Sequence, residues 1–159
     1  MSTTPMTPRG LTRLHEELRR LIEIERPQNV RDIEVARAHG DLRENAEYHA
    51  AKERQSHIIG QIQQLETQIA TAEVIDPQLL SGTRVIFGAT VTLTDLDTED
   101  APPVCYQIVG DPESDLAAGL ISISSPIARG LIGKELGDEV AVATPRGKRN
   151  FLIDRVEFK

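Results

Sequence analysis

Two carboxylates stand close together in the segment Gly40-Asp41-Leu42-Arg43-Glu44-Asn45. Asp41 and Glu44 are three residues apart at a predicted helix start, so their side chains can converge on one face. Such a pair suits Mg²⁺, which often binds through one or two carboxylates and completes its shell with phosphates and water. The same spacing also suits a helix cap, in which Asp41 accepts backbone amides and Glu44 lies at the third helical position. Spacing alone favours the cap.

Basic side chains surround this acidic pair: Arg31, Arg37, Arg43, Lys52 and Arg54. They could contact phosphate groups, or they could form ion pairs on a solvated helix face, and the pattern alone favours the ion pairs. Three histidines lie in the same region, but they lack the spacing of a zinc site and no cysteine is near. Cys105 lies in a strand pattern, and a buried apolar role is favoured there over a nucleophilic one.

A long helix is predicted before the acidic pair. It begins at Thr7-Pro8, because Thr is a good N-cap and Pro suits the first helical position. Pro27 should kink this helix or shift its register. Gly40 should end it in the left-handed conformation. The apolar seam comprises Leu11, Leu14, Leu18, Leu21 and, on a shifted stripe, Val30, Ile33 and Arg37.

A second long helix is predicted to open after Asp41. Its seam has heptad spacing: Ala51, Gln55, Ile58, Ile62, Leu65, Ile69 and Ala72. Each helix would have about thirty residues and a length of ~45 Å. The short break makes the two helices antiparallel neighbours, so we expect a two-helix coiled coil with its tip near residues 39–44. A helical rod that buries so little surface is suited to holding its tip far from the rest of the chain.

The second half of the chain changes to short β-branched runs with Gly and Pro between them. Strands are predicted at residues 84–87, 89–94, 104–109, 120–123, 139–144 and 150–158. A short helix is predicted at residues 126–132 with Ser125 as its N-cap, a turn at Pro145-Arg146-Gly147, and a mobile acidic loop at residues 95–103. We therefore predict an α+β chain. Its domains would be a coiled-coil hairpin with an acidic tip at residues 1–75 and a small antiparallel β domain with one short helix at residues 76–159.

The composition limits the possible partners. The chain has 159 residues, of which 25 are acidic and 18 basic, for a net charge of −7. Free DNA binding should therefore be weak or absent. The single cysteine excludes an internal disulfide and suits a reducing cytoplasm. The sequence has no visible secretory signal, and no apolar run approaches the ~18 residues of a membrane helix. With no Trp, two Tyr and three Phe, an aromatic-lined ligand pocket is not expected.

The segment Gly40-Asp41-Leu42-Arg43-Glu44-Asn45-Ala46-Glu47-Tyr48-His49-Ala50-Ala51-Lys52-Glu53 strongly resembles the tip and second helix of bacterial Gre transcript cleavage factors of the GreA type. Three further stretches agree, at residues 5–7, 85–91 and 125–134. The resemblance therefore covers essentially the whole chain, in the same order.

The resemblance implies that the coiled coil enters the secondary channel of RNA polymerase. There Asp41 and Glu44 would help to hold a second catalytic Mg²⁺, shared with the polymerase and not bound stably by the factor alone. The polymerase, not the factor, would then cleave backtracked RNA near its 3′ end. The resemblance also implies that Arg37 and Lys52 contact the RNA. The C-terminal domain would be FKBP-like and would dock on the polymerase through Ser124, Ser125 and Pro126.

Three other functions are consistent with parts of the sequence. A Gre-like inhibitor would occupy the channel without cleavage, but the intact Asp41 and Glu44 pair argues against it. A prolyl isomerase would suit an FKBP-like domain, but the few aromatic residues argue against its pocket. A coiled-coil scaffold would do no chemistry, and it would tolerate neutral substitutions at the tip.

Overall fold

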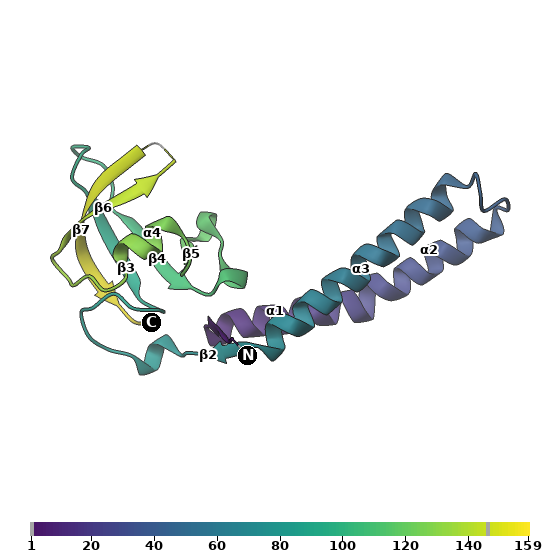
Figure 1. Ribbon diagram of the computed structural model, residues 1–159, viewed down its shortest axis with the longest axis horizontal. Coiled ribbons are helices and arrows are strands. Elements are labelled where there is room, and N and C mark those ends of the chain that lie inside the picture. The colour runs from purple at the N-terminus through teal and green to yellow at the C-terminus, as the bar shows by residue number, and fades with distance from the viewer. Residues whose placement is uncertain (1, 146) are drawn as a thin grey trace. The chain divides into compact units, whose positions relative to one another are not determined.

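The computed structural model describes residues 2–145 and 147–159 (Figure 1). Contacts within the chain divide it into two compact units. The helical unit comprises Leu11–Thr71, and the sheet unit comprises Met1–Gly10 together with Ala72–Lys159. The first residues of the chain thus belong with its C-terminal half. Each unit is described separately below.

A long helix forms the first arm of the helical unit. It consists of α1 (Pro8–Arg20), a π-helical turn η1 (Leu21–Glu25) and α2 (Arg26–Ala38). Its start agrees with the prediction, since the hydroxyl of Thr7 accepts a hydrogen bond from the Gly10 amide at 3.1 Å. Leu14 and Leu21 of the predicted seam are buried.

The π-helical turn lies directly before Pro27. The Arg26 amide donates to the Leu21 carbonyl, five residues back, instead of to the fourth. Pro27 has no N–H, and its ring would clash with the carbonyl four residues earlier, so a wider turn accommodates it. One extra residue in the turn rotates the following helix by about 100°. The predicted stripe is therefore correct at Ile33 but wrong at Val30, which is 45% exposed.

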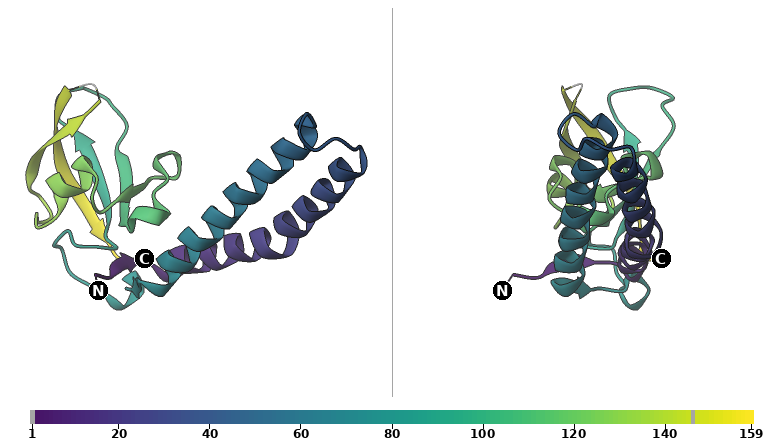
Figure 2. Two further views of the ribbon diagram at one scale, coloured as in Figure 1. Left: turned by 45° about the vertical axis from the view of Figure 1, so that its right-hand side comes forward. Right: turned by 90° about the vertical axis from the view of Figure 1, so that its right-hand side faces the viewer.

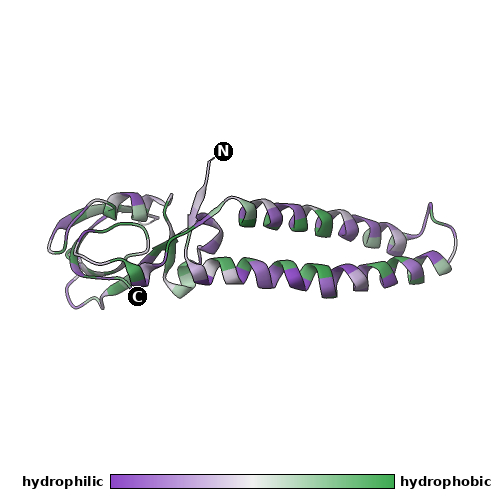
Figure 3. Cartoon of the chain, turned by 90° about the horizontal axis from the view of Figure 1, so that it is seen from below, coloured by the Kyte–Doolittle hydropathy of each residue, from purple (hydrophilic) through white to green (hydrophobic). Residues whose placement is uncertain are grey.

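The second arm is α3 (Ala46–Ala70), and it runs antiparallel to the first (Figures 1 and 2). Its predicted seam is confirmed, because Ile58 and Ile62 are buried against Leu21. Figure 3 shows apolar residues recurring between polar ones along both arms, as expected for a narrow seam. At the α2 face of the seam, the buried residues are Asn29, Ile33 and Ala36, so the predicted Arg37 is wrong as a seam residue.

Polar contacts set the alignment of the two arms. The buried Asn29 side chain donates to the Ala51 carbonyl at 2.9 Å. Glu25 forms ion pairs with Arg20 at 2.6 Å and with Arg54 at 2.5 Å. The hydrogen bond and charge of Arg54, with those of Arg20, hold the pKa of Glu25 below its ordinary value. Arg54 of the predicted basic group is therefore engaged with an acid of the opposite arm.

A five-stranded sheet forms the body of the sheet unit. Its order is β5-β4-β3-β7-β6, with β3 at Thr90–Asp95, β4 at Val104–Val109, β5 at Leu120–Ser122, β6 at Glu139–Thr144 and β7 at Gly147–Glu157. The sheet is mixed, because β5 pairs parallel with β4 while the other pairs are antiparallel. The turn predicted at Pro145-Arg146-Gly147 includes Arg146, which lies outside the described residues.

The hydrophobic core lies on one face of this sheet. It includes Val91, Leu93, Ile108 and Ile153. The short helix α4 (Pro126–Leu131) packs Ala128 and Leu131 into the same core. Short 3₁₀ turns lie at η2 (Pro77–Leu79), η3 (Asp111–Glu113) and η4 (Leu116–Ala118).

Two local predictions for this unit are wrong. Residues 84–87 form no strand: Val85 and Phe87 are buried in an extended segment, and Arg84 makes only an isolated bridge to Glu135. Gly88, with φ of 88°, turns the chain there before β3 begins at Thr90. Cys105 is exposed rather than buried, because it alternates with the core-facing residues of β4.

The first residues of the chain are anchored in the sheet unit. The strand β1 (Thr4–Met6) pairs parallel with β2 (Ala72–Val74). Glu113 is 7% exposed, and its carboxylate accepts hydrogen bonds from the Thr7 amide at 3.1 Å, from the Thr7 hydroxyl, and from the Gly110 amide at 2.8 Å. A buried carboxylate is thus satisfied by three donors.

The acidic loop after β3 is partly ordered by its own side chains. The Asn150 amide donates to Asp97 at 2.8 Å, and this bond lowers the pKa of Asp97. No helix among the described residues is both long and apolar enough to span a bilayer.

Candidate functional site at the hairpin tip

The first arm ends as predicted. The last helical residue of α2 is Ala38, and Gly40 has φ of 84°. The Gly40 amide donates to the Arg37 carbonyl at 3.1 Å. This left-handed glycine satisfies a carbonyl at the helix end and turns the chain into the tip loop, which we define as residues 40–44.

Asp41 does not cap the second arm, and this prediction is wrong. Asp41 has φ of 30°, and α3 begins only at Ala46. The N-cap is Asn45, whose side chain accepts a hydrogen bond from the Tyr48 amide at 3.0 Å. Asp and Asn are equally good caps, so the residue preferences could not choose between the two positions. The carboxylates are therefore not used by the helix start.

Asp41 and Glu44 are both exposed in the tip loop. Neither carboxylate has a hydrogen bond or an ion pair with any residue that the structure describes. Asp41 adopts positive φ, which is uncommon for residues other than glycine although Asp tolerates it better than most. Two free carboxylates on a short loop can supply two of the oxygen ligands that Mg²⁺ takes. The remaining ligands would have to come from elsewhere.

One side chain links the ends of both arms. Besides capping α3, Asn45 donates to the Ala36 carbonyl at 2.7 Å and to the Gly40 carbonyl at 3.2 Å. The His49 ring contributes a further bond to the Arg43 carbonyl at 2.9 Å. The sequence analysis missed this role of Asn45. An Asn directly before a helix was the available indication.

The predicted RNA-contacting residues are exposed on different arms. Arg37 lies in the last turn of α2 and Lys52 in the second turn of α3. The contacts of Asn45 with Ala36 and of Asn29 with Ala51 give the alignment of the arms. By this alignment Lys52 lies about 12 Å further from the tip than Arg37, at 1.5 Å per residue. Lys52 donates to Gln55 at 2.8 Å.

The predicted docking residues surround the start of α4. The Ser125 hydroxyl accepts from the Ala128 amide at 3.1 Å, which confirms it as the N-cap. The Ser124 hydroxyl donates to Asp111 at 2.8 Å, and the Ser122 hydroxyl also donates to Asp111. The Ser122 bond and then the Ser124 bond hold the pKa of Asp111 below its ordinary value. Beside them lies a mainly apolar cleft of about 510 Å³, lined by Leu116, Ile121, Pro126 and Ile127 among others.

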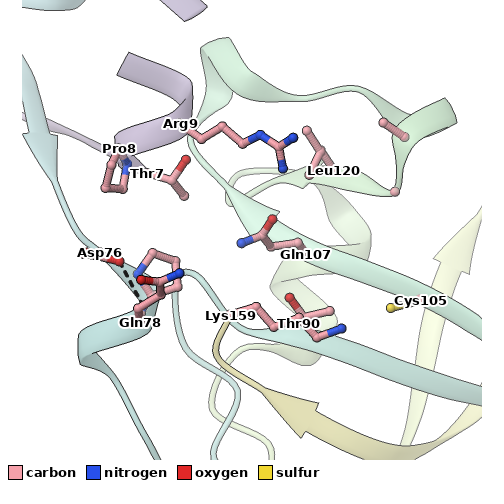
Figure 4. A pocket seen from close by; sticks show the side chains of 13 residues that line it. Thr7, Pro8, Arg9, Asp76, Gln78, Thr90, Cys105, Gln107, Leu120 and Lys159 are labelled. Carbon is pink, nitrogen blue, oxygen red and sulfur yellow. Dashed lines mark hydrogen bonds between the residues drawn. The ribbon is translucent and has the colours of Figure 1, made fainter. Parts of the chain in front are cut away.

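A second recess of about 660 Å³ lies against the outer face of the sheet (Figure 4). Thr90, Cys105 and Gln107 line its floor. Its lining residues also include the basic Arg9 and Lys159 and the acidic Asp76, whose side chain accepts the Gln78 amide at 2.9 Å. These lining residues form a recess of mixed polar and apolar character, and they include no pair of acidic side chains.

Comparison with known proteins identifies the family. Two family models match the chain: "Transcription elongation factor, N-terminal" over residues 4–74, and "Transcription elongation factor, GreA/GreB, C-term" over residues 80–158. The transcription elongation factor GreA of Anaeromyxobacter sp. (strain K) is 56% identical over 158 residues, which is 99% of this chain and 94% of the relative. That of Phenylobacterium zucineum is 54% identical over 99% of both chains.

Among solved structures, the GreA factor homolog 1 (Gfh1) of Thermus thermophilus is 25% identical, with a TM-score of 0.44 over 98% of this chain and 99% of that one. The two family models together span nearly the whole sequence, and the full-length identities exceed one half. The chain therefore belongs to the GreA/GreB family of transcription elongation factors.

Proposed function

We propose that this elongation factor inserts its helical hairpin into the secondary channel of RNA polymerase and stimulates the polymerase to cleave backtracked RNA. In this proposal the factor is not a nuclease by itself. It supplies Asp41 and Glu44, and the polymerase supplies the rest of the catalytic site and the RNA. The observation that carries the proposal is a pair of exposed carboxylates, without partners among the described residues, on a short loop between two long helices.

The chemical type of the donors at the tip supports a shared Mg²⁺ site. Mg²⁺ commonly binds through one or two protein carboxylates and keeps other positions for phosphate and water. When bound between this pair and the polymerase, the ion would activate a water molecule and stabilise charge on the cleaved phosphodiester. Because Asp41 and Glu44 are engaged in no other bond among the described residues, their oxygens are available without breaking a contact.

The basic residues near the tip support a role beside RNA. Arg37 is exposed in the last turn of α2, and its guanidinium has no hydrogen-bond or ion-pair partner among the described residues. An arginine without an acidic partner can contact a phosphate group without first losing an ion pair. Lys52 lies further from the tip and would contact a more distant nucleotide. Both contacts position RNA rather than read its sequence.

The sheet unit would dock on the polymerase surface through Ser124, Ser125 and Pro126. The apolar cleft beside these residues offers a surface for an apolar side chain of the partner. The hydrogen bonds of Ser122 and Ser124 with Asp111 hold the segment before α4 in place. A pre-ordered segment loses less conformational entropy on docking.

The test uses a stalled, backtracked elongation complex with labelled RNA in the presence of Mg²⁺. The native factor and an Asp41→Asn/Glu44→Gln variant are each added, and RNA length is followed over time. We expect rapid shortening with the native factor and its loss with the variant. Binding of both proteins to the polymerase is measured by competition with labelled native factor, and equal affinities are expected because the substitutions are nearly isosteric.

Other outcomes would contradict the proposal. Equal shortening with both proteins would remove the carboxylates from the mechanism. Binding without shortening by either protein would instead support a channel-occupying inhibitor. A leucine substitution at Ile127 in the apolar cleft should change polymerase affinity but not the maximal cleavage rate, which separates docking from chemistry.

A further inference from the structure

We propose that Asn45 is a positioning residue that holds the tip loop in the conformation in which Asp41 and Glu44 act. This inference rests on the proposed function, because it assigns to Asn45 a part in the same site. Asn45 does not itself touch RNA or metal in this proposal. It acts through the backbone on either side of the two carboxylates.

The amide of Asn45 bonds both arms at the tip, where the exposed side chains of His39 and Glu47 also approach each other across the arms, at 3.9 Å. Its oxygen accepts from the Tyr48 amide, in the first turn of α3. Its nitrogen donates to the carbonyl of Ala36, in the last turn of α2, and to that of Gly40, the first residue of the tip loop. These bonds close the base of the tip loop, so the two chain ends that carry it are held together.

The loop above this base has few other constraints. Asp41 is held at φ of 30°, a region that L-residues rarely adopt. The carboxylates themselves have no partners among the described residues, and the ring of His49 bonds only the Arg43 carbonyl. A strained backbone conformation persists only where surrounding bonds determine it. The bonds of Asn45 to Ala36 and Gly40 are the ones placed to do so.

The chemistry of the amide allows its two roles to be separated. Asn offers both an acceptor and donors, whereas Ser and Asp can accept at an N-cap with similar preference. Asn45→Ser therefore keeps the cap of α3 but is too short to reach the Ala36 carbonyl. Asn45→Asp keeps the cap and the length but has no donor. Both variants lose the link to α2, and only the second also adds negative charge.

The hairpin provides a matched control at Asn29. Its side chain also donates to a carbonyl of the opposite arm, that of Ala51, at 2.9 Å. It lies well down the arms, opposite residue 51, and not at the tip. Asn29→Ser thus removes one bond of the same kind between the same helices, and it reports any general effect of loosening the hairpin.

The experiment measures loop mobility and cleavage for Asn45→Ser, Asn45→Asp, Asn29→Ser and the native factor. NMR relaxation of the free proteins reports the backbone order of residues 41–44. We expect increased mobility there for both Asn45 variants and no change for Asn29→Ser. In the backtracked complex at saturating factor, the maximal cleavage rate should fall by about 10- to 100-fold for Asn45→Ser. Its polymerase affinity should stay unchanged, and more Mg²⁺ should be needed for half-maximal rate.

Two results would overturn the inference. One is a cleavage rate for Asn45→Ser within about 2-fold of native, while Asp41→Asn/Glu44→Gln abolishes cleavage. In that case the proposed function stands and Asn45 has no positioning role. The other is equal loss of cleavage in Asn45→Ser and Asn29→Ser, which would assign the effect to hairpin stability. If the acidic pair itself proves dispensable, the proposed function fails, and the role of Asn45 in cleavage fails with it.

Discussion

Replacement of Glu113 by alanine should strongly destabilise the sheet unit. The buried carboxylate accepts the backbone amides of Thr7 and Gly110 as well as the Thr7 hydroxyl. Alanine leaves the two amides without an acceptor in a buried site. Each unsatisfied amide costs about 1–2 kcal/mol, so the free energy of unfolding should fall by about 2–4 kcal/mol. For a domain of this size that is a decrease in Tm of roughly 10–25 °C.

At the same site, a second substitution should destabilise or stabilise the protein depending on whether the Glu113 side chain is present. A Cβ at Gly10 would lie 2.0 Å from the Oε1 atom of Glu113. In the native background Gly10→Ala must therefore displace a carboxylate that is held by three hydrogen bonds, and we expect it to destabilise. In the Glu113→Ala background the three atoms nearest to that Cβ, all of the Glu113 side chain, are gone. There Gly10→Ala should stabilise by about 0.5–1 kcal/mol, the ordinary gain of Ala over Gly in a helix.

A double-mutant cycle measures this coupling. Calorimetry of the four proteins gives the unfolding of the sheet unit, and hydrogen exchange of the Thr7 and Gly110 amides reports the site directly. Protection of both amides should fall in Glu113→Ala. A loss below about 1 kcal/mol in Glu113→Ala, or the same effect of Gly10→Ala in both backgrounds, would refute the reasoning.

Three further outcomes are expected. The pKa of Asp111 is lower in the folded protein than its ordinary value of 3.8. Its hydrogen bonds therefore stabilise the fold above that pH, and this stabilisation is lost as pH falls through the lowered pKa. Asp111→Asn should flatten the acid side of the curve of stability against pH, measured by urea unfolding. Gly40→Ala should destabilise the hairpin by about 1 kcal/mol through its positive φ, whereas Gly60→Ala, within α3, should stabilise it by a similar amount. Arg54→Met should lower the hairpin's Tm at low salt, because it removes the ion pair with Glu25. That ion pair is exposed to solvent, so the decrease in Tm should be smaller in 1 M salt, where the Debye length is only about 3 Å.

The helical arms were predictable because their patterns are local. Thr7-Pro8 and Gly40 gave the limits of the first arm, and the heptad spacing gave the buried face of the second. The seam after Pro27 was not predictable in detail. A proline predicts a disturbance, but whether the helix kinks or inserts one residue depends on packing against the opposite arm. Here the insertion buries Asn29 and leaves Val30 exposed.

The acidic pair was found from residue types, while its local structure was not. The sequence offers two acceptable caps, Asp41 and Asn45. The bonds of Asn45 to Ala36 and Gly40 across the tip, together with its cap bond to Tyr48, decide between them. Glu113 was missed for a related reason. It lies in an Asp-Pro-Glu-Ser-Asp stretch that is typical of a surface loop, and its burial depends on residues more than a hundred positions away.

The strand prediction at residues 84–87 failed because β-branched composition reports burial more than pairing. Val85 and Phe87 do enter the core, but the backbone between them pairs with no neighbouring strand. The parallel pairing of β5 with β4 was likewise not visible, since it depends on the path of the connecting 3₁₀ turns.

The parallel pairing of β1 with β2 has a consequence for how this chain can be rearranged. Parallel neighbours cannot be joined by a tight turn and need a crossover connection of about a dozen residues or more. The entire helical hairpin serves as that crossover, entering after Met6 and returning at Ala72. The entropy of closing such a connection grows only with the logarithm of its length. A helical hairpin of another length could therefore be inserted between Met6 and Ala72 without a change in the strand connections of the sheet unit.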